Sequence, residues 1–280
     1  MREARRGLGG FGTRIVEAGP PEDAQAALFV HGNPGSSEDW DALVEQSGKT
    51  GRTIAFDLPG WGRAEKPRGF HYDIDGYADY IGRALDELGV KKVHLVLHDY
   101  GGFFGLRWAA NHPGSVASVV LINTPGVPIG YHWYLLANLW RTPVVGELFM
   151  LSTIWPTFKV LIGRGNPKGL PDAAVKRMYR DLDSATRRTI LKLYRSTPNP
   201  AALAPALKSI LQPLSLPALV IWGDHDPYIP LAMVQRQRQV FDDLEVVHLP
   251  DSGHWPFLDD PVGVEQALIP FLRRVWRREP

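Results

Sequence analysis

The chain contains no cysteine, which excludes disulfide bonds, thiol catalysis and metal sites built on thiolates. It also lacks any uninterrupted apolar run of the ~18 residues that a membrane-spanning helix requires. No single sign of charge dominates, because 31 lysines and arginines stand against 30 aspartates and glutamates. Such a balance gives no overall field toward nucleic acid or an anionic membrane, so we expect neither as a partner.

Cofactor motifs are absent as well. The sequence has no glycine-rich dinucleotide or phosphate-binding loop, and its histidines do not show the spacing of metal ligands. We therefore expect neither a metal nor an organic cofactor. The first ten residues, MREARRGLGG, are basic but lack the apolar run of a signal peptide, which makes the cytoplasm the default location.

What the sequence does contain is a series of short apolar runs separated by helical stretches. The runs cover residues 26–32, 52–57, 93–99, 116–123, 218–223 and 244–250, and several are too continuously apolar for a half-exposed sheet. Helical stretches include residues 74–88 and 103–111. This alternation predicts an α/β fold with a mostly parallel central sheet flanked by helices.

The pattern changes between residues 126 and 211, where no clear strand is present. The segment is rich in Trp, Tyr, Leu and Arg and is interrupted by prolines. We predict a helical cap inserted into a core domain made of residues 1–125 and 212–280. Its aromatic residues predict a small, largely apolar ligand; they are Trp133, Trp140, Phe149, Trp155 and Phe158. The oligomeric state is left open, with a homodimer as one candidate.

Polar residues follow the predicted strands, and three of them can form a catalytic set. In chain order these are Asp99, Asp226 and His254, with the roles of nucleophile, orienting acid and base. Ligands of open α/β sheets bind beyond the carboxyl ends of the strands, so we expect the three side chains to meet there. The plain alternatives are an N-cap for Asp99 and a surface loop for His254, and Asp224 competes with Asp226 for the role of acid.

From about residue 10 to the last helix, the sequence resembles the α/β-hydrolase superfamily, through HGNP (31–34), HDYGG (98–102), GDHD (223–226) and GHW (253–255). That superfamily carries its nucleophile on a sharp strand-to-helix turn, followed in the chain by the acid and the histidine. Serine is the usual nucleophile, and Asp99 stands in its place here. The resemblance selects Asp226 as the acid, and it implies the α/β-hydrolase fold with a helical cap.

An aspartate nucleophile implies attack on an sp³ carbon, which leaves an alkyl ester on Asp99. His254, oriented by Asp226, is then expected to activate the water that hydrolyses the ester. The resemblance further implies that the backbone N–H groups of Tyr100 and Asn33 stabilise the oxyanion of that second step. His98, within the same motif as Asp99, is carried as a further substrate-binding candidate.

Two families combine this layout with an aspartate nucleophile, the epoxide hydrolases and the haloalkane dehalogenases. Asn33 resembles the dehalogenase residue that helps to hold the halide. Dehalogenases also place a tryptophan directly after the nucleophile, whereas this chain has Tyr100, and Trp155 is a candidate replacement.

The motif HDYGG and Tyr194, within LKLYRS, are similar to epoxide hydrolases, whose cap tyrosines protonate the oxide oxygen. Tyr134 is a further substrate-binding candidate, although packing is the favoured interpretation for Tyr131, Tyr134 and Tyr179. We expect hydrolysis of a small apolar epoxide, with dehalogenation of a halogenated substrate as the alternative. A non-catalytic binder of small ligands on the same fold is a third hypothesis.

Overall fold

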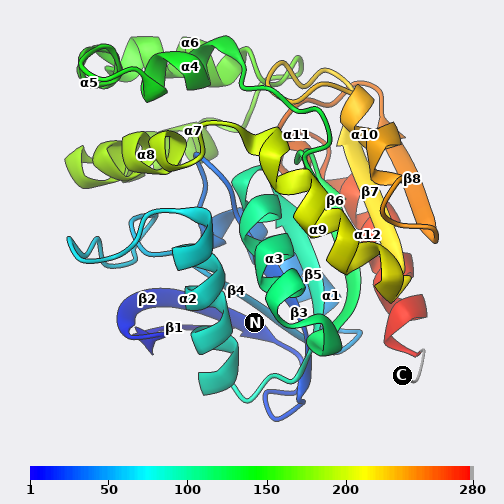
Figure 1. The fold of residues 1–280 in the computed structure, drawn as a ribbon. Helices are drawn as coiled ribbons and strands as arrows, with labels where there is room; N and C mark the ends of the chain where they lie inside the picture. Colours follow the sequence, from blue (N-terminus) through cyan, green and yellow to red (C-terminus); the bar gives the residue numbers. More distant parts are fainter. Residues whose placement is uncertain (278–280) are drawn as a thin grey trace.

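An eight-stranded sheet runs through the computed structural model, which describes residues 1 to 277 (Figure 1). The strand order is β1-β2-β4-β3-β5-β6-β7-β8, and all neighbours from β4 to β8 run parallel. The mostly parallel sheet is therefore confirmed. The predicted core segment extends to residue 280, and its last three residues lie outside the described part of the chain.

All six predicted strands are present, and the strand bounds are β1 (Arg2–Leu8), β2 (Phe11–Ala18), β3 (Gln25–Val30), β4 (Arg52–Phe56), β5 (Lys92–His98), β6 (Val116–Ile122), β7 (Ala218–Gly223) and β8 (Leu244–Leu249). The sequence did not predict β1 and β2, which form an antiparallel edge beside β4. Six of the seven residues of β1 are exposed, so this strand carries no apolar pattern. In contrast, β3 to β7 are almost completely buried, which explains their continuous apolar sequences.

Helices cover both faces of the sheet. Figure 1 shows α2 (Ile74–Glu87), α3 (Tyr100–Asn111) and α9 (Ala204–Leu211) in front of it, with α1 (Asp41–Ser47) and α12 (Pro261–Trp276) behind. Two short helices follow β7 and β8, namely α10 (Ala232–Gln237) and α11 (Pro256–Asp259). The described residues also form four 3₁₀ turns: η1 (Ser37–Trp40), η2 (Pro113–Ser115), η3 (Pro200–Leu203) and η4 (Gln212–Leu214). Side-chain caps fix some helix starts: Asp73 accepts the N–H of Gly76 at 2.8 Å, and Asp260 accepts that of Gly263 at 3.1 Å.

Of the α-helices between β6 and β7 in the chain, five stand beyond the carboxyl ends of the strands (Figure 1). We call them the inserted helices; they are α4 (Leu135–Arg141), α5 (Val145–Ser152), α6 (Trp155–Gly163), α7 (Asp172–Asp181) and α8 (Ser184–Ser196). The predicted cap also included α9, but α9 packs on α3 beside the sheet. The inserted helices end at Ser196, whereas the predicted cap extends to residue 211.

Within residues 1 to 277, no single helix is long and apolar enough to cross a membrane. The pair α5 and α6 meets the same criteria only when both helices, bent by 100° relative to each other, are taken together.

Candidate active site

Polar side chains from five neighbouring strands meet at the carboxyl edge of the sheet. Asn33 follows β3, Asp99 follows β5, Asn123 follows β6, Asp226 follows β7 and His254 follows β8. These strands are adjacent in the sheet, so residues up to 221 positions apart in the chain lie within one hydrogen-bonded cluster. The inserted helices cover this edge.

Asp99 lies on a tight turn between β5 and α3, with a positive φ of 49°. Two glycines permit this turn: a Cβ at Gly101 would overlap the carbonyl oxygen of Val30, and a Cβ at Gly102 would overlap Oγ1 of Thr124. Asp99 occupies the N-cap position of α3, yet its side chain makes no capping hydrogen bond to the helix. The turn instead directs the carboxylate toward the cluster, a strained geometry of the kind that persists at functional sites.

The two oxygens of the Asp99 carboxylate have different surroundings. Oδ1 accepts the backbone N–H of Asn33 at 2.8 Å, and the nearby backbone N–H of Tyr100 helps to lower the pKa of the carboxyl group. Oδ2 lies 3.7 Å from Nε2 of His254. One oxygen is therefore held by a backbone donor, and the other faces the imidazole.

His254 and Asp226 form a buried hydrogen-bonded pair. Nδ1 of His254 lies 2.7 Å from Oδ2 of Asp226, and Oδ1 of Asp226 accepts the backbone N–H groups of Tyr228 and Ile229 at 2.8 and 3.0 Å. Asp224 instead contacts His248 at 2.7 Å on the exposed side of the sheet edge. Of the two candidate acids, only Asp226 contacts His254.

Electrostatics couple the nucleophile candidate to the base. Burial raises the pKa of the Asp99 carboxyl, and His254 and the two backbone N–H groups oppose that rise without cancelling it. Burial alone lowers the pKa of His254, but the charge and hydrogen bond of Asp226, together with the charge of Asp99, outweigh it and raise the net pKa. An imidazole oriented in this way can take a proton from a water molecule beside Asp99.

The loop that carries His254 is held from two sides. Asp259 accepts hydrogen bonds from Ser252, from the N–H of Gly253 at 3.0 Å and from Asn166. Only Asp260 caps α12. These contacts fix the loop independently of the histidine side chain.

His98 was predicted to bind substrate, and the structure gives it another position. It is fully buried behind the turn, and its Nε2 lies 2.8 Å from the carbonyl oxygen of His254. Its ring packs against the ring of His254, with centroids 4.8 Å apart, and edge-on against Phe257 at 4.9 Å, and it does not line the cavity described below. His98 therefore supports the backbone of His254.

Two tyrosines from the inserted segment meet above Asn33. The hydroxyl groups of Tyr134 and Tyr194 lie 2.9 Å apart, and Nδ2 of Asn33 donates to the Tyr194 hydroxyl at 3.3 Å. Burial, followed by nearby Tyr194 and Asp99, raises the pKa of Tyr134, and burial followed by Asp99 raises that of Tyr194. Both groups therefore stay protonated and available as donors.

The ring of Tyr100 forms a wall beneath this pair. It packs edge-on against Tyr194 with ring centroids 4.9 Å apart and stacks on Trp133 at 5.6 Å. The side chain of Tyr100 does not line the cavity described below, so its contribution to the site is the backbone N–H.

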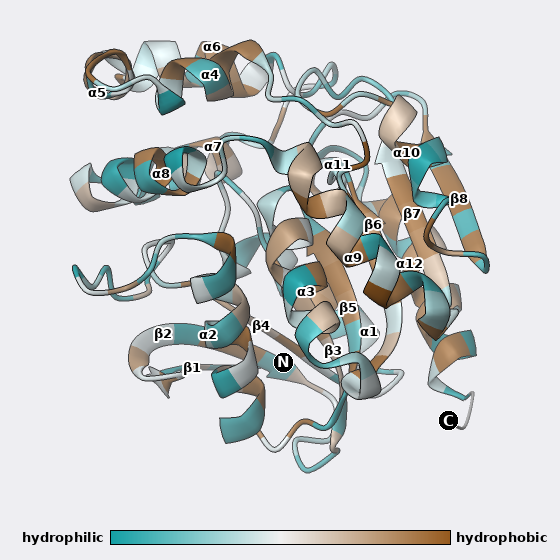
Figure 2. Ribbon diagram, viewed as in Figure 1, coloured by the Kyte–Doolittle hydropathy of each residue, from teal (hydrophilic) through white to brown (hydrophobic). Residues whose placement is uncertain are grey.

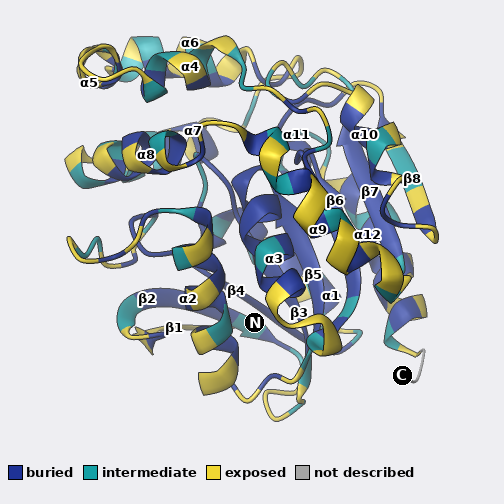
Figure 3. Ribbon diagram, viewed as in Figure 1, coloured by how far each residue is buried: buried dark blue, intermediate teal, exposed yellow. Residues whose placement is uncertain are grey.

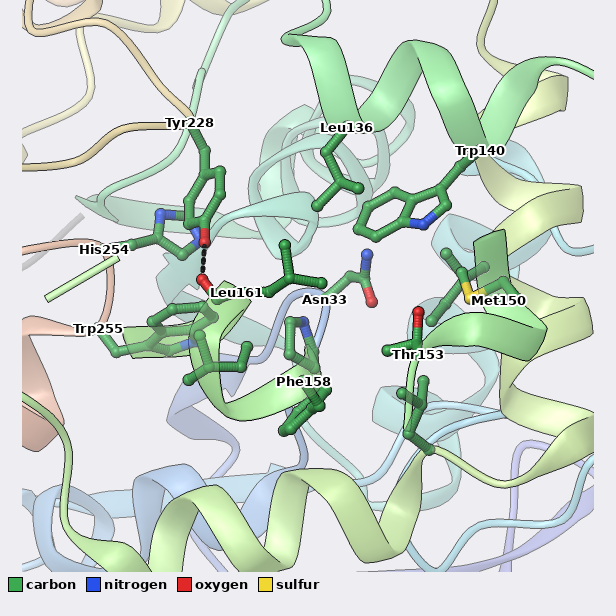
Figure 4. A pocket seen from close by; sticks show the side chains of 14 residues that line it. Asn33, Leu136, Trp140, Met150, Thr153, Phe158, Leu161, Tyr228, His254 and Trp255 are labelled. Carbon is green, nitrogen blue, oxygen red and sulfur yellow. Dashed lines mark hydrogen bonds between the residues drawn. The ribbon is translucent and has the colours of Figure 1, made fainter. Parts of the chain in front are cut away.

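A cavity extends from His254 into the inserted helices (Figure 4). Its polar end carries Asn33, His254 and Tyr228, and the Tyr228 hydroxyl donates to the carbonyl oxygen of Leu161 at 2.9 Å. The remaining wall is mainly apolar and includes Leu136, Trp140, Met150, Phe158, Leu161, Ile162, Leu182, Ile190 and Trp255. A cavity with this lining suits a small apolar molecule with one polar group.

Trp155 does not line this cavity, contrary to its prediction as a halide donor. It lies in the first turn of α6 and packs edge-on against Tyr179 of α7, with ring centroids 5.3 Å apart. Trp140, which the sequence treated only as part of an aromatic lining, faces the cavity, and its indole N–H has no hydrogen-bond partner among the described residues.

Sequence reasoning missed two further contributors, Asn123 and Tyr228. Asn123, with φ of 39°, donates to Asp226 at 2.9 Å and exchanges hydrogen bonds with both backbone groups of Gly223. Its position at the end of a strand was visible in the sequence, but its partner was not. Tyr228 lies edge-on to His254 at 5.0 Å and follows Asp226 by two residues. Residues 1 to 277 contain no group of three or more His, Asp or Glu side chains that could hold a metal ion.

Comparison with known proteins gives a consistent family. The profile of the alpha/beta hydrolase family matches residues 27–267. An uncharacterized hydrolase of Saccharomyces cerevisiae is 28% identical over 257 residues, covering 86% of this chain and 87% of that protein. Epoxide hydrolase 2 of Caenorhabditis elegans is 25% identical over 277 residues, covering 92% of this chain and 76% of that protein. A haloalkane dehalogenase of Agrobacterium fabrum is 34% identical over 142 residues, and this match covers 47% of this chain and 46% of that protein.

Solved structures of both kinds share the fold. The haloalkane dehalogenase DbeA from Bradyrhizobium elkani superimposes with a TM-score of 0.84 at 23% identity, covering 98% of each chain. The epoxide hydrolase CorEH superimposes with a TM-score of 0.81 at 18% identity, covering 98% of this chain and 99% of the other. At these identities the likeness concerns the fold alone.

Proposed function

Because the chain belongs to the alpha/beta hydrolase family, we propose that it hydrolyses small apolar epoxides to diols through an ester on Asp99. In the first step Oδ2 of Asp99 attacks a ring carbon, the carbon–oxygen bond of the epoxide breaks, and the oxygen takes a proton from a tyrosine hydroxyl. The product of this step is a hydroxyalkyl ester. Oδ1, which accepts the N–H of Asn33, becomes the ester carbonyl oxygen, and we assign the N–H of Tyr100 to the same oxygen as a second donor.

In the second step His254 takes a proton from water, and the resulting hydroxide attacks the ester carbonyl carbon. The negative charge that develops on Oδ1 meets the same two backbone N–H groups, which are already in place. Collapse of this intermediate releases the diol and restores the Asp99 carboxylate. The imidazolium proton then returns to the tyrosinate, directly or through solvent, so the protons balance.

The observation that carries the proposal is the pair of hydroxyl groups of Tyr134 and Tyr194 above Asn33. Tyr194 accepts from the Asn33 amide, and one tyrosine of the pair donates to the other. Whichever tyrosine donates, the other keeps a hydroxyl proton that is not used by any described residue. That proton suits the oxygen of an epoxide, whose departure as an unprotonated alkoxide is unfavourable.

Matched substrates and variants test this proposal. The protein should convert terminal epoxides with apolar chains to diols, and changing both Tyr134 and Tyr194 to Phe should slow ester formation by about 10²–10⁴-fold. Displacement of bromide from a bromoalkane of the same chain length needs no proton and should change far less. Tyr179→Phe, which lies away from the pair, is the control. An unchanged rate of epoxide opening in the double variant would refute the proposal, and absence of turnover on every substrate would favour the binding protein.

Dehalogenation is the second candidate, and one observation favours it. The indole N–H of Trp140 and the amide of Asn33 line the same cavity, and the indole has no other partner among the described residues. Two N–H groups of this kind suit a departing halide. If the protein releases bromide, Trp140→Phe should slow that release and Trp155→Phe should not. Equal effects of the two substitutions would exclude Trp140 as the halide donor.

A further inference from the structure

The outer side of three inserted helices is unusually apolar. Among the described residues, most of the well-exposed large aliphatic side chains lie between positions 135 and 160; we call these the outer apolar surface, which consists of Leu135, Val144, Val145, Leu148, Leu151, Ile154 and Val160. Leu151 is 74% exposed and Leu148 is 61% exposed. Positions 144, 148 and 151 share one face of the helical turn, and Figures 2 and 3 show hydrophobic and exposed segments together on α4, α5 and α6.

Packing inside the protein does not account for this surface. The inner side of the same helices already supplies apolar residues to the cavity, as the neighbours Leu135 and Leu136 illustrate: Leu135 is exposed and Leu136 lines the cavity. A surface helix normally has a polar outer face, and a helix that is apolar on all sides usually has an apolar neighbour on each of them. The composition of the outer apolar surface therefore predicts an apolar neighbour that lies outside the described part of the protein.

Charge identifies the kind of neighbour. Residues 135 to 196 contain eleven Lys and Arg but four Asp and Glu, a net charge of +7. The whole chain carries +1, so the remaining residues carry −6. The segment that carries the outer apolar surface contains three basic residues, Arg141, Lys159 and Arg164. Its one acidic residue, Glu147, pairs with Arg195 at 2.7 Å. The near-neutral charge of the whole chain is therefore the sum of a basic segment, residues 135 to 196, and an acidic remainder.

We infer that the outer apolar surface docks on an anionic lipid membrane, with α4, α5 and α6 lying in its interface. Aliphatic side chains would enter the boundary between headgroups and acyl chains, and the flanking basic residues would contact anionic headgroups. A second copy of the chain fits less well, because the same basic side chains, with a net charge of +2 over residues 135 to 164 (three basic minus one acidic), would face each other and repel. This inference does not depend on the reaction proposed above, since it uses only the outer side of the inserted helices.

Binding to vesicles tests the inference with the full chain. The protein should float with vesicles of phosphatidylcholine and phosphatidylglycerol and bind at least tenfold more weakly to phosphatidylcholine alone. Leu148→Gln combined with Leu151→Gln should weaken binding to the mixed vesicles by tenfold or more, because two leucine side chains leave the apolar phase. Lys159→Gln and Arg164→Gln should each weaken it about fivefold, and the effect should shrink in high salt.

Val262→Gln is the matched control, because Val262 is also 61% exposed but lies on α12, away from the inserted helices. It should bind vesicles like the unchanged protein, and equal unfolding curves for all variants would show that they fold normally. Absence of vesicle binding, equal binding to neutral and anionic vesicles, or an equal loss in Val262→Gln would overturn the inference. A dimer that dissociates in the Leu148 and Leu151 variant would overturn it in favour of a second copy.

Discussion

Replacing Asn123 by alanine should destabilise the protein by about 3–5 kcal/mol. The Asn123 side chain continues the β6–β7 ladder after Ile122: its Oδ1 accepts the N–H of Gly223 at 2.9 Å, and its Nδ2 donates to the carbonyl oxygen of Gly223 at 3.1 Å. Loss of these contacts leaves a buried N–H without its partner, which costs about 1–3 kcal/mol, and the lost bond to Asp226 adds about 1 kcal/mol. Forcing alanine into the positive φ of this position adds about 1 kcal/mol.

The positive φ of Asn123 also predicts which of two small side chains is better tolerated at this position. At an ordinary site, glycine is less stable than alanine by about 0.5–1 kcal/mol. At position 123, Asn123→Gly loses the same hydrogen bonds but relieves the positive φ, so it should be more stable than Asn123→Ala. Equilibrium unfolding in urea measures both, with the exposed Asn111→Ala as control. An alanine variant at least as stable as the glycine variant, or within about 1 kcal/mol of the unchanged protein, would refute the reasoning.

The same substitution should also slow the second chemical step more than the first. Asp226 loses the Asn123 donor but keeps the N–H groups of Tyr228 and Ile229, so His254 is less well oriented without being released. Formation of the ester on Asp99 does not require the histidine as a base. We therefore expect Asn123→Ala to accumulate ester in a rapid-quench experiment, and equal slowing of both steps would contradict this role.

Three further outcomes follow from the site. Tyr194→Phe should lower the free energy of unfolding by about 1–3 kcal/mol, because it leaves the buried Asn33 amide without an acceptor, whereas Tyr134→Phe should lower it by about 1 kcal/mol or less. Unfolding in urea measures both variants, and a larger loss for Tyr134→Phe would be inconsistent with the hydrogen bonds described. Ester hydrolysis should speed up as pH rises through the raised pKa of His254, because the neutral imidazole is the base, and a rate that falls over this range would contradict that role. The stability that the ion pair of His254 contributes is fully present below about pH 6.5 and is lost over the same rise in pH. Gly102→Ala should destabilise the protein by about 1–3 kcal/mol, because the added methyl group overlaps a buried threonine. Gly114→Ala, with open space around it, should change the stability by no more than about 0.5 kcal/mol, and equal effects of the two substitutions in thermal unfolding would refute the steric argument.

The sequence was sufficient where local pattern and burial coincide. The buried strands β3 to β7 were predicted within a residue or two because both of their faces are covered and their runs are continuously apolar, and the partly buried β8 was predicted from its apolar run as well. The edge strand β1 escaped because its charged residues face solvent and its pairing with β2 leaves no trace in the composition.

Side-chain direction and distant pairing set the limits of the sequence reasoning for the site. The hydrogen bond between His98 and the carbonyl oxygen of His254, 156 positions away, could not be inferred from spacing. The meeting of Tyr134 and Tyr194, 60 positions apart, depends on how α4 and α8 pack and could not be inferred from spacing. The +7 charge of the inserted helices was visible in the sequence but was averaged away in the total for the chain.

The most direct test of the proposed chemistry is the intact mass of His254→Gln after incubation with a mixed pool of epoxides and bromoalkanes. Without its base the protein should retain the ester on Asp99, and Asp99→Asn in the same background should retain none. We predict an adduct with the mass of a whole epoxide. An adduct with the mass of the alkyl group alone would mean that halide had left, and no adduct from a folded protein would contradict Asp99 as the nucleophile.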